Sequence, residues 1–189
     1  MVAVTEADPL RVEYTTVRQL IDFITYAVES ISFEFDRWDD DYVRGPGLYF
    51  VIVTGVHSGE YADTIGDSRW PIEDCRVVTE DLDRFVESAR TVGNTHDGAV
   101  VISTDGTVQE QMVRIKSQGT STATDEGQNI EYADWMGTKH MSAVEVSVRE
   151  EVVAAVTLSE ENGRMSIFED GGYEDYLRDE LGGVWRSGD

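Results

Sequence analysis

The chain has one cysteine, two lysines, three prolines and no long hydrophobic run among its 189 residues. The single cysteine, Cys75, excludes an internal disulfide and a cysteine-based metal cluster. The longest apolar run, Leu48 to Val53, is too short to cross a bilayer as a helix, which needs about 20 apolar residues. The first residues also lack the basic-then-apolar pattern of a signal peptide. We therefore expect a cytoplasmic protein with no membrane partner.

Positive charge is scarce: 15 Lys and Arg residues stand against 38 Asp and Glu, for a formal net charge of −23. A nucleic-acid partner is not expected, because its phosphates would repel such a chain. The acidic residues are spread over the whole sequence, which argues against one acidic patch for a basic partner. High salt would screen their repulsion, so we expect a salt-adapted protein. A hydrophobic content of 40% indicates a folded globule, and the length favours one domain.

Apolar periodicity predicts an α/β fold with a central mixed β-sheet flanked by helices. Thr15 or Thr16 is the expected N-cap of the first helix, and Thr79 that of the second. A turn at Asp105-Gly106 should join two strands as a hairpin. The predicted helices cover residues 17–31, 79–92, 137–148 and 173–181. The predicted strands cover residues 48–54, 100–102, 108–115, 152–158 and 165–168. Residues 57–69, with His57, and 117–136 are expected to be loops, and residues 1–189 to form a single domain.

The stretch Gly137-Thr138-Lys139-His140 follows the long polar loop and opens a predicted helix. A helix start presents free backbone N–H groups and the positive end of the helix dipole, which together bind phosphate oxygens. A hydroxyl, an ammonium and an imidazole stand beside them. Taken alone, four residues could equally be an ordinary helix cap.

Two further stretches lie at the edges of predicted strands. Asp97-Gly98-Ala99 sets a carboxylate beside backbone that a ligand can approach closely. Ser159-Glu160-Glu161-Asn162-Gly163 sets a hydroxyl and two acids in a turn after a strand. Each could be only a turn. Together with the helix start at Gly137, which could bind phosphate, they fit a site for a nucleotide and a divalent metal ion.

In this order the three stretches resemble the motifs of the diadenylate cyclase domain family, the DisA_N-type domain. That family carries an Asp-Gly-Ala motif, a Gly-Thr-Arg-His-Arg motif and, in many members, a Ser-Glu-Glu-Thr-Gly turn between two strands. The motif-bearing core covers about residues 82–171, and the N-terminal helix and strand would complete the domain. The acidity suggests an archaeal, salt-adapted member.

The resemblance implies an enzyme that condenses two ATP molecules into cyclic di-AMP and releases two pyrophosphates. Two domains would face each other in a homo-oligomer, each holding one ATP, with Mn²⁺ or Mg²⁺ as cofactor. Asp97 would be catalytic and would bind the metal with Glu161. The remaining site residues would bind the nucleotide: Gly98, Ala99, Gly137, Thr138, Lys139, His140 and Ser159. Val113 and Arg114 would lie on a strand beside the adenine.

Two positions depart from the Gly-Thr-Arg-His-Arg motif. Lys139 replaces an arginine and keeps the charge without the planar fork that grips phosphate, and Met141 replaces a second arginine with no charge. Arg114 or Lys116 could supply the missing charge. Met141 also keeps open a degenerate domain that senses ATP or cyclic di-AMP, and a scaffold whose motifs are only turns is a third possibility.

Overall fold

The computed structural model describes residues 9–55, 60–116 and 129–182, with side chains from residue 16 onward. His57 and residues 117–128 of the expected loops lie outside these ranges. The helices are α1 (Pro9–Glu34), α2 (Leu82–Thr95) and α3 (Thr138–Ser147), and a short 3₁₀ turn covers Arg178–Glu180. The strands are β1 (Leu48–Val53), β2 (Ala62–Arg69), β3 (Val100–Ser103), β4 (Gln111–Ile115), β5 (Val152–Leu158), β6 (Met165–Glu169) and β7 (Gly172–Tyr176).

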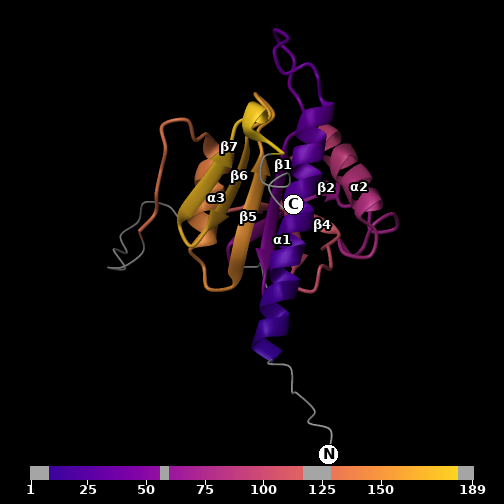
Figure 1. Ribbon diagram of the computed structural model, residues 1–189, viewed down its shortest axis with the longest axis vertical. Coiled ribbons are helices and arrows are strands. Elements are labelled where there is room, and N and C mark those ends of the chain that lie inside the picture. Colours follow the sequence, from indigo (N-terminus) through magenta and orange to yellow (C-terminus); the bar gives the residue numbers. More distant parts are fainter. Residues whose placement is uncertain (1–8, 56–59, 117–128, 183–189) are drawn as a thin grey trace, which may run out of the picture.

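Five strands form the central sheet in the order β3-β1-β5-β6-β7. β1 runs parallel to β3, and the remaining neighbours are antiparallel. All six residues of β1 are buried, as expected of a strand covered on both faces. Figure 1 shows α1 on one side of the sheet, next to α2, and α3 on the other side. The predicted mixed sheet flanked by helices is confirmed.

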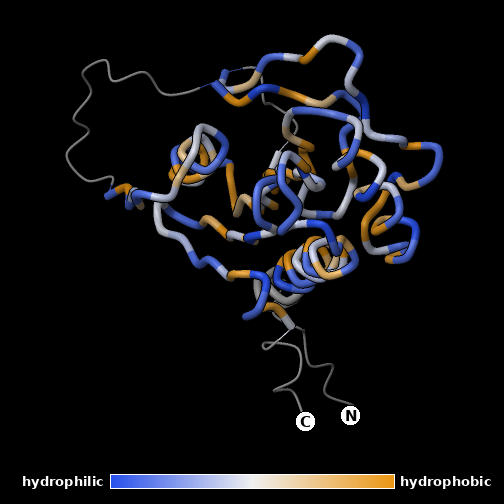
Figure 2. Tube along the Cα trace, turned by 90° about the horizontal axis from the view of Figure 1, so that it is seen from above, coloured by the Kyte–Doolittle hydropathy of each residue, from blue (hydrophilic) through white to orange (hydrophobic). Residues whose placement is uncertain are grey.

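Two apolar clusters fill the two sides of this sheet. One joins α1 and α2 to side chains such as Phe50 and Val156, and the other joins α3 to Val51 and Ala155 on the opposite face. Neighbouring residues of one strand thus enter different clusters, because side chains alternate across a sheet. Hydrophobic and hydrophilic residues also alternate along the helices in Figure 2, as expected of helices that cover a sheet with one face.

Residues 62–69 were expected to be a loop, and this expectation is wrong. They form β2, which pairs with β4 in a separate two-stranded sheet. The hairpin expected around the Asp105-Gly106 turn is shorter than predicted, because β4 begins only at Gln111. Isolated bridges at Ala99–Val113 and Ile102–Val108 join this segment to β3 and to the residue before it. β2 and β4 cover the sheet edge beside Gly98.

Three predicted helix boundaries also need correction. α1 begins at Pro9, well before Thr15, and Asp81 rather than Thr79 caps α2 by accepting a hydrogen bond from the Arg84 N–H at 3.0 Å. α2 continues through Gly93 to Thr95. The predicted last helix, 173–181, is instead strand β7 followed by the 3₁₀ turn. The other predicted strands and the helix after Gly137 are confirmed within a few residues.

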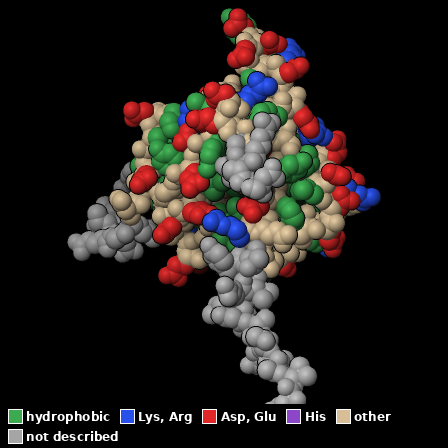
Figure 3. All heavy atoms as spheres, viewed as in Figure 1, with side chains coloured by type: hydrophobic (Ala, Val, Ile, Leu, Met, Phe, Trp, Pro, Cys, Tyr) green, Lys and Arg blue, Asp and Glu red, His purple; other side chains and the backbone are tan. Residues whose placement is uncertain are grey.

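Acidic side chains are scattered over the face of the molecule drawn in Figure 3, among fewer basic ones. This distribution agrees with acidic residues spread along the sequence rather than gathered in one patch. In the ranges that the structure describes, no helix combines the length and the apolar character needed to cross a membrane.

Candidate functional site

Two neighbouring cavities of about 320 Å³ each lie where the three sequence motifs meet. We call the first the aspartate cavity; it is lined by Arg44, Gly45, Gly47, Gly93, Asn94, Thr95, His96, Asp97, Gly98, Lys139 and Glu160. We call the second the helix cavity; it is lined by Trp135, Gly137, Thr138, Lys139, His140, Ser159, Glu160, Glu161, Asn162 and Arg164. Lys139 and Glu160 line both, so the two cavities share a wall.

The N-terminus of α3 opens into the helix cavity. Gly137 is the N-cap, with an extended backbone and no side-chain cap, and its carbonyl accepts the first helical hydrogen bond from Met141 N–H at 3.0 Å. The N–H groups of the first turn therefore have no partner within the helix. A Cβ added to Gly137 would meet no atom within 4 Å. This open, positively polarised end suits an anionic ligand.

The Lys139 side chain crosses between the two cavities. Its ammonium donates to the carbonyl of Leu158 at 3.4 Å, and a Cβ on Gly47 would come within 2.9 Å of Nζ. Burial lowers the pKa of Lys139, while the nearby carboxylates of Glu160, Asp97 and Glu161 act in the opposite direction. The ammonium therefore lies in a confined space, and the carboxylates around it come from two of the three motifs.

His140 and Ser159 lie on the inner wall of the helix cavity. His140 is 8% exposed, and burial lowers its pKa to about 4, helped by the positive charges of Lys139 and Arg164. Its Nε2 is buried without a hydrogen-bond partner among the described residues. The Ser159 hydroxyl accepts a hydrogen bond from the Glu161 N–H at 3.3 Å, which leaves its own proton to donate. The imidazole is neutral near pH 7, so the fixed positive charge of this wall comes from Lys139 and Arg164.

Asp97 and Gly98 reach the aspartate cavity from the link between α2 and β3. Asp97 is exposed and Gly98 is partly buried with φ of 115°, a conformation that favours glycine. A Cβ there would lie 2.6 Å from Ile65 Cδ1 and 3.0 Å from the Val113 carbonyl. The close neighbour of this glycine is therefore the β2–β4 sheet. Ala99 is buried and exchanges backbone hydrogen bonds with Val113, away from both cavities.

The expected metal ligands, Asp97 and Glu161, lie in different cavities with Lys139 between them. Over the described ranges, no group of three or more His, Cys, Asp or Glu side chains comes together as a metal site. Carboxylates are suitable ligands for Mg²⁺ or Mn²⁺, and such ions in nucleotide sites take only one or two of them and complete their shell with phosphate oxygens and water. The residues fit a metal ion only in that shared form.

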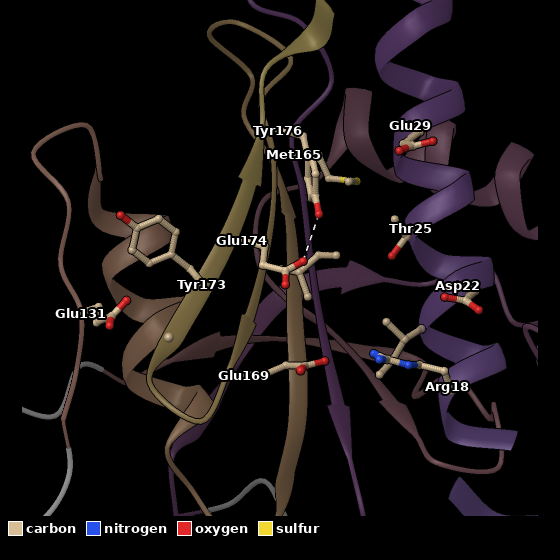
Figure 4. A pocket seen from close by; sticks show the side chains of 13 residues that line it. Arg18, Asp22, Thr25, Glu29, Glu131, Met165, Glu169, Tyr173, Glu174 and Tyr176 are labelled. Carbon is tan, nitrogen blue, oxygen red and sulfur yellow. Dashed lines mark hydrogen bonds between the residues drawn. The ribbon is translucent and has the colours of Figure 1, made fainter. Parts of the chain in front are cut away.

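A larger cavity, about 610 Å³, lies elsewhere, between α1 and the strands β6 and β7 (Figure 4). Thr25 and Asp22 point into it from α1, and Glu169 and Glu174 line it from the strands. With Arg18 its single basic side chain among several acids, this lining would repel a polyphosphate. Its greater size does not make it the nucleotide site.

Sequence reasoning missed several lining residues. Arg44 and Gly47 come from the segment Arg44-Gly45-Pro46-Gly47, in which the residue pattern indicated no site, and Arg44 pairs with Glu160 at 3.0 Å. Arg164 follows the Ser159 turn directly, a position that could have drawn notice. Neither Arg114 nor Lys116, the suggested sources of extra charge, lines either cavity; Lys116 pairs with Asp63 at 3.1 Å.

A known protein family matches this region. The model of the family described as DisA bacterial checkpoint controller nucleotide-binding (DAC) matches residues 71–173, more than half of the chain. The chain belongs to this family. The matched range begins before the expected core and contains all three sequence motifs, from Asp97 to Gly163, and Arg164 after them.

Solved structures resemble this DAC chain at low sequence identity. A hypothetical membrane spanning protein from Bacillus cereus aligns with a TM-score of 0.51 and 20% identity, over 82% of this chain and 61% of that one. A double-cysteine mutant of DacA from Staphylococcus aureus aligns with a TM-score of 0.49 and 16% identity, over 90% of this chain and 95% of that one. The first likeness supports the fold alone. No curated protein matches the chain.

The departures from the DAC motif have different structural settings. Lys139 lies inside the site, between the cavities, whereas Met141 is 42% exposed and lines neither of them. The Lys139 replacement therefore keeps a charge in place. The Met141 replacement leaves the outer side of α3 without one.

Proposed function

We propose that this chain is a diadenylate cyclase, which condenses two ATP molecules into cyclic di-AMP and releases two pyrophosphates at a site shared by two facing protomers. The observation that carries the proposal is the meeting of a helix N-terminus and the Lys139 ammonium with the Asp97 carboxylate, in a chain of the DAC family. One cavity supplies charge for phosphates, and its neighbour supplies an acid for a hydroxyl.

The triphosphate would bind in the helix cavity. Backbone N–H groups after Gly137, the Thr138 and Ser159 hydroxyls and the Lys139 ammonium are the donors that would face its oxygens. As the reaction proceeds, negative charge accumulates on the leaving pyrophosphate. Donors already fixed at that place stabilise this charge without reorganisation.

The ribose would lie toward the aspartate cavity, beside Asp97 and Gly98. The 3′-hydroxyl oxygen of each ATP attacks the α-phosphorus of the other, the new ester bond forms, and the α–β phosphoanhydride bond breaks. The Asp97 carboxylate accepts or directs the hydroxyl proton. A divalent ion held by Asp97 or Glu161 with phosphate oxygens would neutralise triphosphate charge. Because each hydroxyl attacks the α-phosphorus of the other ATP, the ATP held by the second protomer is part of the reaction.

A degenerate domain that senses nucleotide is the second candidate. Met141 favours it, because an arginine of the family motif is missing there and the residue is exposed beside the site. Such a domain would bind ATP or cyclic di-AMP and turn over neither.

The deciding experiment incubates the purified protein with ATP and Mn²⁺ in molar potassium chloride and looks for cyclic di-AMP by mass spectrometry. We expect product from the wild type and none from Asp97→Asn, with both proteins equally folded by circular dichroism. Full activity of Asp97→Asn would refute the role of Asp97. ATP binding without product, over a range of metal ions and salt concentrations, would select the sensor instead.

A further inference from the structure

Arg164 is the basic residue of the helix cavity that the family motifs do not account for. It directly follows the turn from Ser159 to Gly163 and directly precedes β6. Its side chain lines the cavity with those of Thr138, His140 and Ser159. We propose that Arg164 binds the polyphosphate of the nucleotide and supplies the guanidinium that position 141 lacks. This inference rests on the proposed nucleotide function of the same cavity.

The Arg164 side chain is held in place before any ligand arrives. Its guanidinium carbon lies 4.2 Å from the centroid of the Trp135 ring, and Nη1 donates to the Asp175 carboxylate on β7. Trp135 is fixed in turn by edge contacts with His140 and Tyr173, at centroid distances of 5.0 and 5.8 Å. Only 17% of the Arg164 side chain is exposed. A side chain ordered in this way loses little rotamer entropy when it binds an anion.

Donors remain available on this guanidinium. Arginine has five N–H groups, and within the described residues the side chain's hydrogen bonding goes to Asp175 through Nη1. Nε and Nη2 are therefore left for phosphate oxygens. Placed against the wall that holds His140 and the α3 N-terminus, they add to the donors of that wall rather than forming a separate site.

The position of Met141 allows a test of whether an arginine at position 141 can take the place of Arg164. Met141 lies three residues after Thr138 on α3, and residues at this spacing share one side of a helix. Thr138 lines the helix cavity, and Met141 beside it is exposed. An arginine introduced at position 141 could extend over Thr138 to the same phosphates from outside.

The test measures binding by calorimetry with three probes: inorganic pyrophosphate, ATP and adenosine. Arg164→Met should weaken pyrophosphate and ATP binding by roughly tenfold to a hundredfold, the range for losing hydrogen bonds to a charged group. Adenosine binding should not change, because adenosine has no phosphate. In the Met141→Arg, Arg164→Met double variant, pyrophosphate binding should recover by at least about tenfold, since a guanidinium is restored.

Asp175→Asn is the matched control for a purely structural role of Arg164. It removes the ion pair but leaves the guanidinium beside Trp135, and Asp175 does not line the cavity. Pyrophosphate should then bind within a few fold of the wild type, because the loss of the ordering contact with Asp175 is offset by the removal of a competing carboxylate, while Trp135 still holds the guanidinium. A loss as large as that of Arg164→Met would show that the ion pair matters for the fold alone and would overturn the proposal.

Equal pyrophosphate affinity of the wild type and Arg164→Met would also overturn it. If Arg164→Met does not fold, Arg164→Lys replaces it as the test variant, because lysine keeps the positive charge but lacks the planar guanidinium with its paired donors. A severalfold loss of pyrophosphate affinity in Arg164→Lys supports the proposal, and unchanged affinity refutes it. The readout needs no turnover. A chain that makes no cyclic di-AMP but loses pyrophosphate binding with Arg164 would refute the cyclase and retain this inference.

Discussion

At the scale of single residues, the most perturbed side chain of the site is His140. Burial lowers the pKa of its imidazole to about 4, and the positive charges of Lys139 and Arg164 act in the same direction. In an unfolded chain the pKa of histidine is about 6.5. Between these two values the unfolded chain binds a proton that the folded chain does not. The contribution of the neutral imidazole to stability is therefore complete above pH 6.5 and is lost as the pH falls toward 4.

This difference predicts the pH dependence of a variant. With His140→Gln as the reference, the free energy of unfolding of the wild type should fall faster between pH 6.5 and 4, by up to about 1.4 kcal/mol per pH unit. Urea unfolding of both proteins at a series of pH values measures it, and the carboxylates that titrate in the same range cancel in the comparison. A difference between the two proteins that stays constant with pH would show that the folded and unfolded chains protonate His140 at the same pH, so that burial does not lower its pKa.

Residue patterns in the sequence indicated part of this site and could not indicate the rest. Gly137, Asp97 and Ser159 could be found because each stands at the edge of an element that local periodicity predicts. The partners of Arg164 and Glu160 could not be assigned, because they are far away in the sequence: Arg164 contacts Trp135, which precedes α3, and Glu160 pairs with Arg44. Such contacts depend on how β1, β5 and α3 assemble.

At the scale of elements, a hydrogen bond from α1 fixes the turn between β5 and β6. Gly163 has φ of 71°, and its carbonyl accepts a hydrogen bond from the Ser32 hydroxyl of α1 at 2.8 Å. The Ser32 carbonyl in turn accepts one from Trp38 Nε1 at 2.9 Å. This contact attaches the turn that carries Ser159 to the end of the first helix.

Gly163→Ala should therefore destabilise the protein by about 2 kcal/mol, the cost of strained backbone plus a clash. The added Cβ would lie 2.7 Å from Ser32 Oγ and 2.8 Å from Trp38 Cε2. Gly55→Ala is the control, because a Cβ there meets nothing within 4 Å, and its effect should stay within about 0.5 kcal/mol. The denaturant midpoints of unfolding measure the stability of both variants, and equal midpoints would contradict the close packing of Gly163 against Ser32 and Trp38.

Elements with weak local signals were the ones predicted wrongly. The segment 62–69 has no alternation of apolar residues, and it becomes a strand because β4 offers it a partner. Tyr173, Tyr176 and Leu177 stand at helical spacing, yet this segment pairs with β6 as an edge strand. In both places tertiary pairing overrides the local pattern. β1 and β5, whose residues are almost all apolar, were predicted correctly for the opposite reason.

At the scale of the whole molecule, a net charge of −23 opposes both events that the proposed reaction needs. It repels the triphosphate and it repels a second copy of the chain. At molar salt the Debye length is only about 3 Å, so repulsion between exposed acids is largely screened. The cations fixed at the helix cavity, Lys139 and Arg164, are partly buried and lose less of their attraction to salt. High salt should thus favour assembly more than it weakens phosphate binding.

Mixing active and inactive protomers tests whether the reaction belongs to the pair. Wild type and Asp97→Asn, mixed at low concentration so that protomers exchange and then concentrated, should lose activity as the square of the wild-type fraction. An equal mixture at constant total protein then keeps about a quarter of the activity, because only pairs with two intact protomers react. Cyclic di-AMP formation in molar potassium chloride is the measurement, with an unrelated acidic protein in place of Asp97→Asn as the control, for which half should remain. A linear loss with Asp97→Asn would mean that each protomer completes the reaction without the other's Asp97, and the shared site would have to be abandoned.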